Sequence, residues 1–531
     1  MEAGSINELL DDLIEKHGGF GRFQLFIMVV VLGGMSSVAF SMMMMTFAGF
    51  TPDWSCVIEN DFVQNVVPTS TVKQCYPAID NITTTTCEMF NFSSSMKTVV
   101  RQWDLVCDRA WIPSTITTIQ MSGVLLGGLF TGHLADKIGR KPTFFLSLLI
   151  LLVFNLLCGF SVTWVMFAVC RCFLGIGMGG YLTIFYPYIL EFFPKGRRAV
   201  LTATPMWGIW STVFAFIAMG LPDWKYLHFV TAVCVVPSLL CWWSMPESFR
   251  WLVINHKKEA ALNVIQQMAN FNRKPIQNTK ELEVMMEASV QELATQKTYT
   301  IRDLFMSAKL TKMTCLQIWS WLACGYGYYG VSFEVKGLTG NVYLNMALLS
   351  IVEIPAVMTL YFFTNRLGRK WTSLLFCGIG TFSAVIMAAI ELTDLQSKVY
   401  RTVFPLISKI GVSLTWLAVK LLSIELFPTA IRSVSSGLFN GMARVGSMVA
   451  PQFVYLNDDT PGILYLICSG VLSLTFVCVC FMPETKNRLL PDEMSDFGTK
   501  RLKTKSHRLE IQHMTTIVKH DDDNIILITH M

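Results

Sequence analysis

The stretch Gly132-His-Leu-Ala-Asp136-Lys-Ile-Gly139-Arg140-Lys141 returns in a shortened form as Asn365-Arg-Leu-Gly368-Arg369-Lys370. A second motif, Glu191-Phe-Phe-Pro-Lys-Gly-Arg-Arg198, returns as Glu425-Leu-Phe-Pro-Thr-Ala-Ile-Arg432, with Glu, Pro and Arg at the same spacing. Recurrence of two motifs in the same order indicates an internal repeat. A repeat constrains the architecture of the whole chain more strongly than any single helix or strand does.

A third motif completes the repeat, because Pro246-Glu247-Ser248 is matched by Pro483-Glu484-Thr485. The two copies of the three motifs stand 229, 234 and 237 residues apart (Arg140 to Arg369, Glu191 to Glu425, Glu247 to Glu484). Offsets this similar mean that two halves of the chain run in near register, which favours a duplication.

The composition indicates that most of the chain lies in a membrane. Of 531 residues 53% are hydrophobic and only 15% are charged, and the mean hydropathy is +0.48. Uninterrupted apolar blocks such as 25–47, 143–160 and 462–482 are long enough to cross about 30 Å of hydrocarbon as helices. About twelve such candidates can be read along the chain, which predicts an all-α membrane protein with two six-helix halves.

Clusters of Lys and Arg predict which loops stay in the cytoplasm. They follow the second, fourth, eighth and tenth candidate helices, which are alternate loops: Lys137, Arg140 and Lys141; Lys195, Arg197 and Arg198; Arg366, Arg369 and Lys370; and Arg432. Both termini are therefore expected in the cytoplasm. The acidic, polar stretch 1–20 does not resemble a cleavable signal peptide.

Two long interruptions divide the chain further. The expected organisation is a cytoplasmic N-terminus (1–24), a first transmembrane helix (25–47), an extracellular loop (48–110), helices two to six of the N-terminal half (111–246), amphipathic cytoplasmic linker helices (247–311), a C-terminal six-helix half (312–482) and a cytoplasmic tail (483–531).

The first interruption has the composition of a segment facing an oxidising, glycosylating lumen. It holds two glycosylation sequons, at Asn81 and Asn91, and the four cysteines Cys56, Cys75, Cys87 and Cys107. Two disulfides are expected there. Four cysteines admit three pairings, and the sequence does not choose among them.

These motifs resemble those of a known transporter superfamily. The stretch 132–141 resembles the loop motif of the major facilitators, and Arg171-x-x-x-Gly175-x-x-x-Gly179 resembles their Arg-and-glycine motif. Trp103-Asp-Leu-Val-Cys107 and Glu425-Leu-Phe-Pro-Thr429 resemble the organic cation, anion and carnitine transporter family. The resemblance implies a twelve-helix major facilitator fold whose central cavity opens alternately to each side of the plasma membrane.

Charged residues of the repeated motifs form a predicted gate, because carboxylates and guanidiniums at helix ends can pair and separate. The hypothesis is that they bridge the two halves when the site faces outward. The alternative is a solvated, positive-inside surface without a gating role. The proposed gating residues are Asp136, Arg140, Glu191, Arg198, Glu247, Arg250, Arg369, Glu425 and Arg432.

Ionisable residues within apolar helices cost roughly 2.5 to 3.5 kcal/mol each and usually line a polar pathway. Glu353, Lys409 and Arg444 are such residues, while Lys420 can snorkel to the membrane surface. Arg444 can hold a carboxylate or sulfonate by two hydrogen bonds. The resemblance adds that anion and carnitine members carry Arg at the position of Arg444, whereas cation members carry an acid.

Aromatic residues alternate with glycine in the seventh candidate helix. Tyr326, Tyr328 and Tyr329 form either one wall of an aromatic cavity or ordinary core and interfacial packing. Arg444 for an anionic end, with Glu353 and the tyrosines for a cationic end, suits a carnitine-like zwitterion. A plain organic anion, with Lys409 adding positive field, remains open. Arg171, followed by glycines that indicate tight helix packing, fits structural pairing at least as well as substrate contact.

Several function classes are disfavoured. The chain shows no Gly-rich phosphate loop, no His/Cys metal spacing and no supported Ser-His-Asp order, so neither an enzyme, a metal site, a cofactor nor a nucleic-acid partner is expected. The coupling ion, such as sodium or a counter-transported organic ion, stays open. An organic cation transporter and a non-transporting receptor or scaffold with a transporter fold remain alternatives.

The C-terminal tail offers two interpretations. Its basic segment 500–508 and its last residues, 528–531, can bind anionic lipid or, weakly, a PDZ domain. Disorder is the simpler reading.

Overall fold

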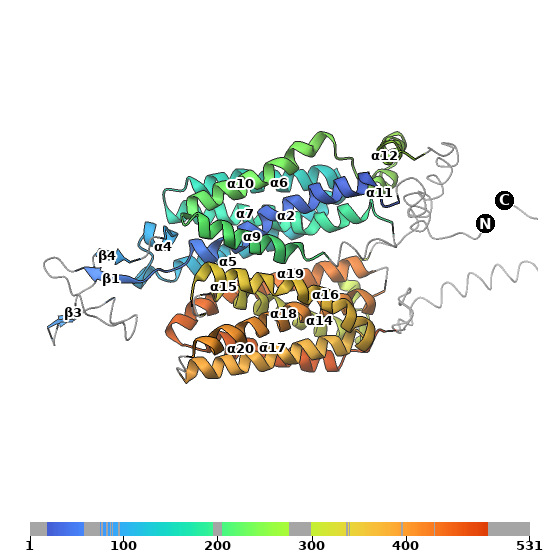
Figure 1. Cartoon of the computed structure of the whole chain (residues 1–531). Coiled ribbons are helices and arrows are strands. Elements are labelled where there is room, and N and C mark those ends of the chain that lie inside the picture. Colours follow the sequence, from blue (N-terminus) through green and yellow to red (C-terminus); the bar gives the residue numbers. More distant parts are fainter. Residues whose placement is uncertain are drawn as a thin grey trace, which may run out of the picture.

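The computed structural model describes residues 19–57, 75, 78–80, 83–84, 87, 89–93, 96–194, 204–274, 299–335, 338, 340–393, 397–428 and 431–486. Figure 1 shows two bundles of helices stacked on each other, the N-terminal half in blue to green and the C-terminal half in yellow to red. Asn81, Arg198 and the tail beyond 486, for which predictions were made, lie outside the described residues.

The N-terminal half consists of long helices, several of which meet at glycines that allow close backbone approach. A Cβ added at Gly123 would collide with the backbone carbonyl of Cys172, and one added at Gly179 with that of Val124. The helices of this half are α2 (Arg22–Ala48), α5 (Ile112–Ile138), α6 (Arg140–Gly159), α7 (Trp164–Leu190), α9 (Met206–Gly220) and α10 (Trp224–Leu240).

The C-terminal half repeats this arrangement, with its second helix broken. The break at Val352 separates α15 from α16, because Pro355 has no N–H to donate to the carbonyl of Ile351. The helices are α14 (Ala308–Phe333), α15 (Val342–Ile351), α16 (Glu353–Leu367), α17 (Arg369–Leu392), α18 (Lys398–Leu426), α19 (Arg432–Asp459) and α20 (Ile463–Cys480).

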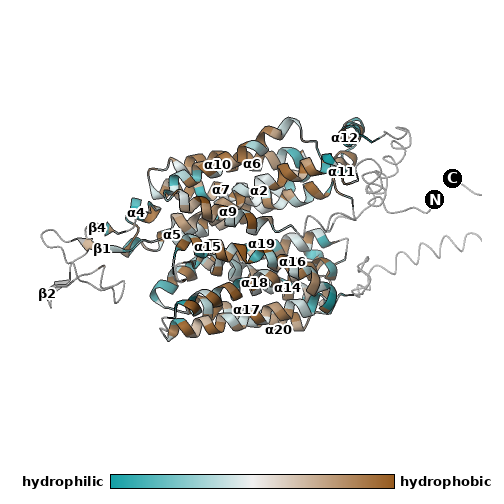
Figure 2. Cartoon of the chain, in the orientation of Figure 1, coloured by the Kyte–Doolittle hydropathy of each residue, from teal (hydrophilic) through white to brown (hydrophobic). Residues whose placement is uncertain are grey.

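The described helices make the expected number of membrane crossings. Eight helical spans are long and apolar enough to cross a membrane, with α15 and α16 forming one of them, and α9 is a shorter apolar helix. The helices α5, α14 and α19 have 27, 26 and 28 residues but are less apolar, as expected of helices that face the partner half. Together these make twelve. Figure 2 shows that hydrophobic residues, in brown, recur along the helices of both halves.

Helix starts differ slightly from the predicted boundaries. Helix α2 begins at Arg22 rather than 25, and α14 begins at Ala308 rather than 312. The predictions placed these starts near Leu25 and Lys312. The structure adds a polar first turn, which for α14 is capped by the Ser307 side chain accepting the Leu310 N–H at 3.2 Å.

The two ends of the helical bundle carry different parts of the chain. The motif end carries the repeated motifs together with the linker elements α11 (Phe249–Ile254), α12 (Lys258–Asn272) and η4 (Ile301–Phe305). The loop end carries the segment between α2 and α5 (Figure 1). That segment contains strands β1 (Trp54–Val57), β2 (Ala78–Asp80), β3 (Thr83–Thr84) and β4 (Met89–Phe92), helix α4 (Val99–Gln102) and the turn η1 (Cys107–Arg109).

The loop end confirms the expected disulfides and selects one of the three pairings. Cys56 is bonded to Cys87, and Cys75 to Cys107. Antiparallel pairing of β1 with β4 places Cys56 opposite Phe90 and close to Cys87. Asn91 is exposed on β4, so its side chain is open to modification.

The halves touch mainly through two pairs of helices, α5 with α19 and α9 with α15, and more sparsely through α2 with α14 and α9 with α16. Thr118 on α5 donates to the backbone carbonyl of Met448 at 3.0 Å and accepts from Gln452 at 2.9 Å. Toward the loop end the ring of Phe47 stacks on that of Tyr343 with centroids 5.3 Å apart. Both contacts join the halves directly.

Candidate functional site

A buried ion pair lies in the C-terminal half at the face turned toward the N-terminal half. Lys409 Nζ on α18 stands 2.8 Å from Glu353 Oε1, and the side chains are only 3% and 9% exposed. Glu353 is in the first turn of α16 because the helix breaks just before it, and a carboxylate is stabilised at a helix N-terminus. The structure thus brings together two of the predicted site residues.

Three further side chains, two from α14 and one from α18, complete a cage around this pair. Lys409 Nζ donates to Ser332 Oγ at 2.5 Å and lies 3.3 Å from the ring centroid of Tyr328. Glu353 also accepts from the Tyr328 hydroxyl at 3.2 Å and from the Ser413 hydroxyl at 3.3 Å. The charges of Lys409 and Glu353 therefore cancel locally, which the sequence could not show.

Residues of the N-terminal half close the cage from the other side. Met43 on α2 and Trp207 and Ser211 on α9 line a cavity of about 10 Å³ together with Tyr328, Glu353 and Lys409. This space is close to the minimum that one water needs. The two halves thus enclose a small cavity here, and the surrounding side chains fill nearly all of the space.

Arg444 on α19 is the second charged element of this region. Its Nη1 donates to the Tyr329 hydroxyl at 3.1 Å, and the side chain is half-buried. Among the described residues Arg444 has no acidic partner within ion-pair distance. Lys409, in contrast, has such an acidic partner. The guanidinium of Arg444 therefore keeps N–H donors available for a ligand.

Aromatic rings connect Arg444 with the caged ion pair. Tyr328 and Tyr329 lie edge to face at 5.2 Å, and Trp416 packs on both at 5.4 and 6.3 Å. Tyr326 does not join them, because its ring packs on Phe453 and its hydroxyl donates to the Leu464 carbonyl at 3.4 Å. Of the three predicted tyrosines, two therefore face this region.

Lys420 and Arg171 occupy contrasting surroundings. Lys420 on α18 is exposed, and its Nζ lies 5.4 Å from the ring centroid of Tyr186 in the other half. Arg171 on α7 is completely buried over the ring of Phe167. Its three guanidinium nitrogens have no hydrogen-bond partner within the described part of the chain. Arg171 thus packs inside its own half.

A larger cavity of about 310 Å³ lies at the loop end. It is lined by both halves and by the loop, and its lining includes Trp54, Asp108 and Tyr455. The disulfide partners Cys75 and Cys107 belong to the same lining. The disulfide-bonded loop thus forms one wall of a vestibule between the halves.

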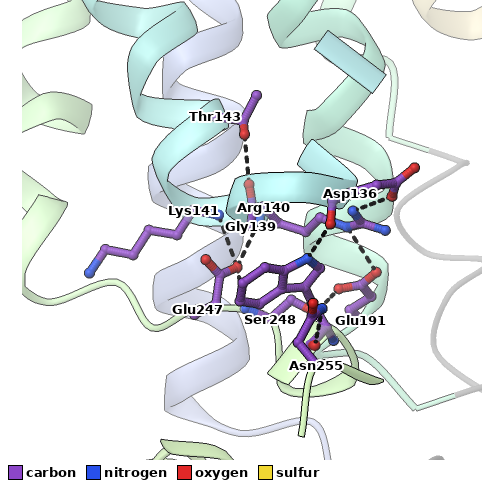
Figure 3. Close-up of polar contacts among 10 residues, drawn as sticks. Asp136, Gly139, Arg140, Lys141, Thr143, Glu191, Glu247, Ser248 and Asn255 are labelled. Carbon is purple, nitrogen blue, oxygen red and sulfur yellow. Dashed lines mark hydrogen bonds and ion pairs between the residues drawn. The ribbon is translucent and has the colours of Figure 1, made fainter. Parts of the chain in front are cut away.

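At the motif end, Figure 3 shows the first copy of the repeated motifs gathered in one cluster. Arg140 Nη1 stands 2.5 Å from Asp136 Oδ1, and its Nε lies 3.7 Å from Glu191 Oε1. Glu247 accepts the backbone N–H groups of Arg140 and Lys141 at 2.9 and 3.0 Å. The Ser248 hydroxyl donates to Glu191.

The second copy has the same construction. Arg369 binds Glu425 Oε1 through Nε at 2.9 Å and Nη2 at 2.8 Å. Glu484 accepts the backbone N–H groups of Arg369 and Lys370 at 2.9 and 3.1 Å. The Thr485 hydroxyl donates to Glu425 at 2.5 Å. Sequence reasoning left Ser248, Glu484 and Thr485 out of the gate, although the repeat itself points to all three.

These ion pairs lie inside each half, whereas the hypothesis had the gating residues bridging the halves in an outward-facing state. The two other described gating residues, Arg250 and Arg432, also interact with residues of their own half. The Arg250 charge acts on Glu191, and Arg432 Nη2 donates to the backbone carbonyl of Phe427 at 3.4 Å. Burial raises the pKa of Glu191, which the Ser248 hydroxyl and the Arg140 charge oppose.

A bundle of twelve spans in two repeated halves, with charged and aromatic residues at their interface, defines a major facilitator transporter. The family described as "Sugar (and other) transporter" matches residues 55–497. The chain belongs to this family and, within it, to the organic cation and organic anion transporters of the solute carriers.

Known relatives agree with this assignment. The chain is 32% identical to organic anion transporter 3 of Oryctolagus cuniculus over 79% of this chain and 78% of that protein. It is 28% identical to an organic cation transporter protein of Drosophila melanogaster over 92% and 95%. Its fold is similar to the inward-open xylose transporter XylE of E. coli, with a TM-score of 0.62, 14% identity and coverage of 88% and 98%.

Proposed function

We propose that this membrane transporter moves organic anions with a carboxylate or sulfonate group by alternating access, and that Arg444 binds the anionic group. One observation carries the proposal. Within the described part of the chain no acid stands beside the Arg444 guanidinium, while Glu353, the acid of that region, is neutralised by Lys409.

The charges of the described site leave a positive excess. Lys409 and Glu353 cancel, whereas Arg444 and the exposed Lys420 face neutral rings or hydroxyls. An unpaired guanidinium in surroundings of low dielectric attracts an anion strongly and can bind it through two parallel hydrogen bonds. The rings of Tyr329 and Trp416 offer an apolar surface for the organic part of such a ligand.

A carnitine-like zwitterion is the second candidate. It would place its carboxylate on Arg444 and its ammonium near Tyr328 and Glu353. That arrangement requires Lys409 to leave Glu353 first, because the pair is 2.8 Å apart and the cavity beside it measures about 10 Å³. The organic anion needs no such rearrangement, so we favour it. The names of relatives, which include both organic anion and organic cation transporters, permit either.

The motif-end clusters are proposed to act as joints of the alternating movement. In each half, the cluster ties the start of one helix, α6 or α17, to the segment that follows the last helix of that half. These ties hold the helices of a half together, so each half can move as a rigid body. The predicted bridging role of these residues would then belong to another state of the cycle, in which the two clusters approach each other.

The orientation proposed from the charges is also supported by the loop. The motif end, rich in Lys and Arg, is assigned to the cytoplasm, and the loop end, with two disulfides and the exposed Asn91, to the outside of the plasma membrane. Both termini are then cytoplasmic.

Uptake into cells tests the proposed substrate class. Labelled aryl carboxylates, carnitine and tetraethylammonium are supplied to cells with the wild-type chain, in the presence and absence of sodium. We expect saturable uptake of the carboxylates and none of tetraethylammonium. Uptake of tetraethylammonium alone would contradict the proposal, uptake of carnitine alone would favour the zwitterion, and specific binding without uptake would indicate a receptor.

A further inference from the structure

The side chain of Lys409 is held in the way that proteins hold a small organic cation. Its ammonium group contacts a carboxylate, a hydroxyl and the face of an aromatic ring at 2.8, 2.5 and 3.3 Å. Carboxylate and ring face together are the usual recognition elements for alkylammonium groups. The cage around Lys409 is therefore a cation site whose occupant is part of the chain.

The acid of this site is positioned independently of Lys409. Tyr328 donates to one carboxylate oxygen of Glu353 and Ser413 to the other, at 3.2 and 3.3 Å. The backbone places Glu353 in the first turn of α16, where the helix terminus stabilises its charge. Removal of Lys409 should thus leave a preformed, negatively charged receptor.

The space within the cage explains why no second cation fits. The free cavity beside Glu353 and Lys409 is about 10 Å³, close to the minimum for one water. Beyond its Cβ, a lysine side chain has the composition of n-propylammonium. Substitution of Lys409 by Ala would open a space of that shape, walled on the N-terminal side by Met43 and Trp207.

We infer that Lys409 is a tethered occupant of an alkylammonium site and thereby a specificity-determining residue that excludes organic cations from Glu353. The consequence for substrate choice rests on the proposed anion transport, whereas the binding site itself does not. The test therefore measures binding through stability, because a ligand that binds only the folded state raises the thermal midpoint. Wild-type uptake of carboxylates tests the proposed function separately.

The thermal midpoint of the purified full chain is measured with increasing n-propylammonium chloride, and with n-propanol as the uncharged analogue. We expect a concentration-dependent rise for Lys409→Ala with the ammonium only. No rise is expected for the wild type, for Lys420→Ala as the matched lysine of the same helix, or for Lys409→Ala combined with Glu353→Gln. An unchanged midpoint in Lys409→Ala, or an equal rise in the double variant, would overturn the inference.

The variant with an unpaired buried acid can also fail to accumulate. In that case n-propylammonium is supplied during expression, and the folded yield is measured by size-exclusion chromatography. A yield restored by the ammonium and not by n-propanol supports the tethered occupant. A yield that stays flat under both additions contradicts it.

Discussion

Glu247 and Glu484 occupy the same place in the two halves, and each accepts two backbone N–H groups at the start of an earlier helix, α6 for Glu247 and α17 for Glu484. Both helices begin after a glycine with positive φ, Gly139 at 113° and Gly368 at 95°. A side chain at either glycine would meet the carboxylate of the glutamate. An anion at the unsatisfied N–H groups of a helix terminus is a stabilising arrangement.

Substitution of either glutamate by Ala should destabilise the chain by about 1 to 3 kcal/mol, because half-buried backbone donors lose their acceptor. Glu247→Ala and Glu484→Ala are expected to lower the thermal midpoint to a similar degree. The control is Glu259→Ala, at an exposed position on α12, which should leave it unchanged. Equal midpoints for all four proteins would show that the two carboxylates are not structural acceptors.

The two arginine clusters should respond differently to loss of their glutamate. Arg369 binds Glu425 through two nitrogens, whereas Arg140 is paired chiefly with Asp136 and stands 3.7 Å from Glu191. Glu425→Gln should therefore reduce stability by about 1 to 3 kcal/mol and lower uptake, and Glu191→Gln should do less. Thermal midpoints and initial uptake rates of the two variants provide the comparison. A larger effect of Glu191→Gln would refute this assignment.

The disulfide pairing can be checked by mass spectrometry of non-reduced peptides. Peptides joined through Cys56 and Cys87, and through Cys75 and Cys107, are expected. The double variant Cys75→Ala/Cys107→Ala should lose about 2 to 4 kcal/mol of stability, because it releases the loop that lines the loop-end cavity. Detection of peptides joined in either of the other two pairings would disprove this connectivity.

Gly446 allows α19 to lie close to α14 beside Arg444. A Cβ at Gly446 would collide with the backbone carbonyl of Leu322, whereas a Cβ at Gly437 on the same helix meets nothing within 4 Å. Gly446→Ala should thus destabilise the chain by about 1 to 3 kcal/mol through overpacking. Gly437→Ala should leave stability nearly unchanged or raise it slightly. Thermal midpoints that are the same for both variants would argue against the close approach.

The repeat was sufficient to predict the two-half fold, because membrane spans and duplicated motifs are visible in the linear order of residues. The partners of charged side chains were harder to predict. Glu353 was expected to bind a cation, but Lys409 lies far from it in sequence and reaches it only through the packing of α18 against α16. Tyr326 and Tyr329 are three residues apart, yet the Tyr326 ring packs on Phe453 of α19 and the Tyr329 ring on Trp416 of α18.

The disulfide pairing shows the same limit. Four cysteines in one loop predict two bonds, while their partners depend on the strand register that sets Trp54 opposite Phe92 and Cys56 opposite Phe90. Glu484, in contrast, could have been found from the sequence alone. Its counterpart Glu247 was assigned to the gate, and the duplication carries that role over to the second half.

The central claim is that Arg444 binds the anionic group of the substrate, and its most direct test is the KM for uptake of the labelled carboxylate with the best wild-type rate. Loss of a charged hydrogen-bonding partner costs about 1.5 to 3 kcal/mol, so Arg444→Gln should raise KM by about 10 to 100-fold at normal surface expression. Arg444→Lys should lie between this variant and the wild type. An unchanged KM in Arg444→Gln would contradict the account.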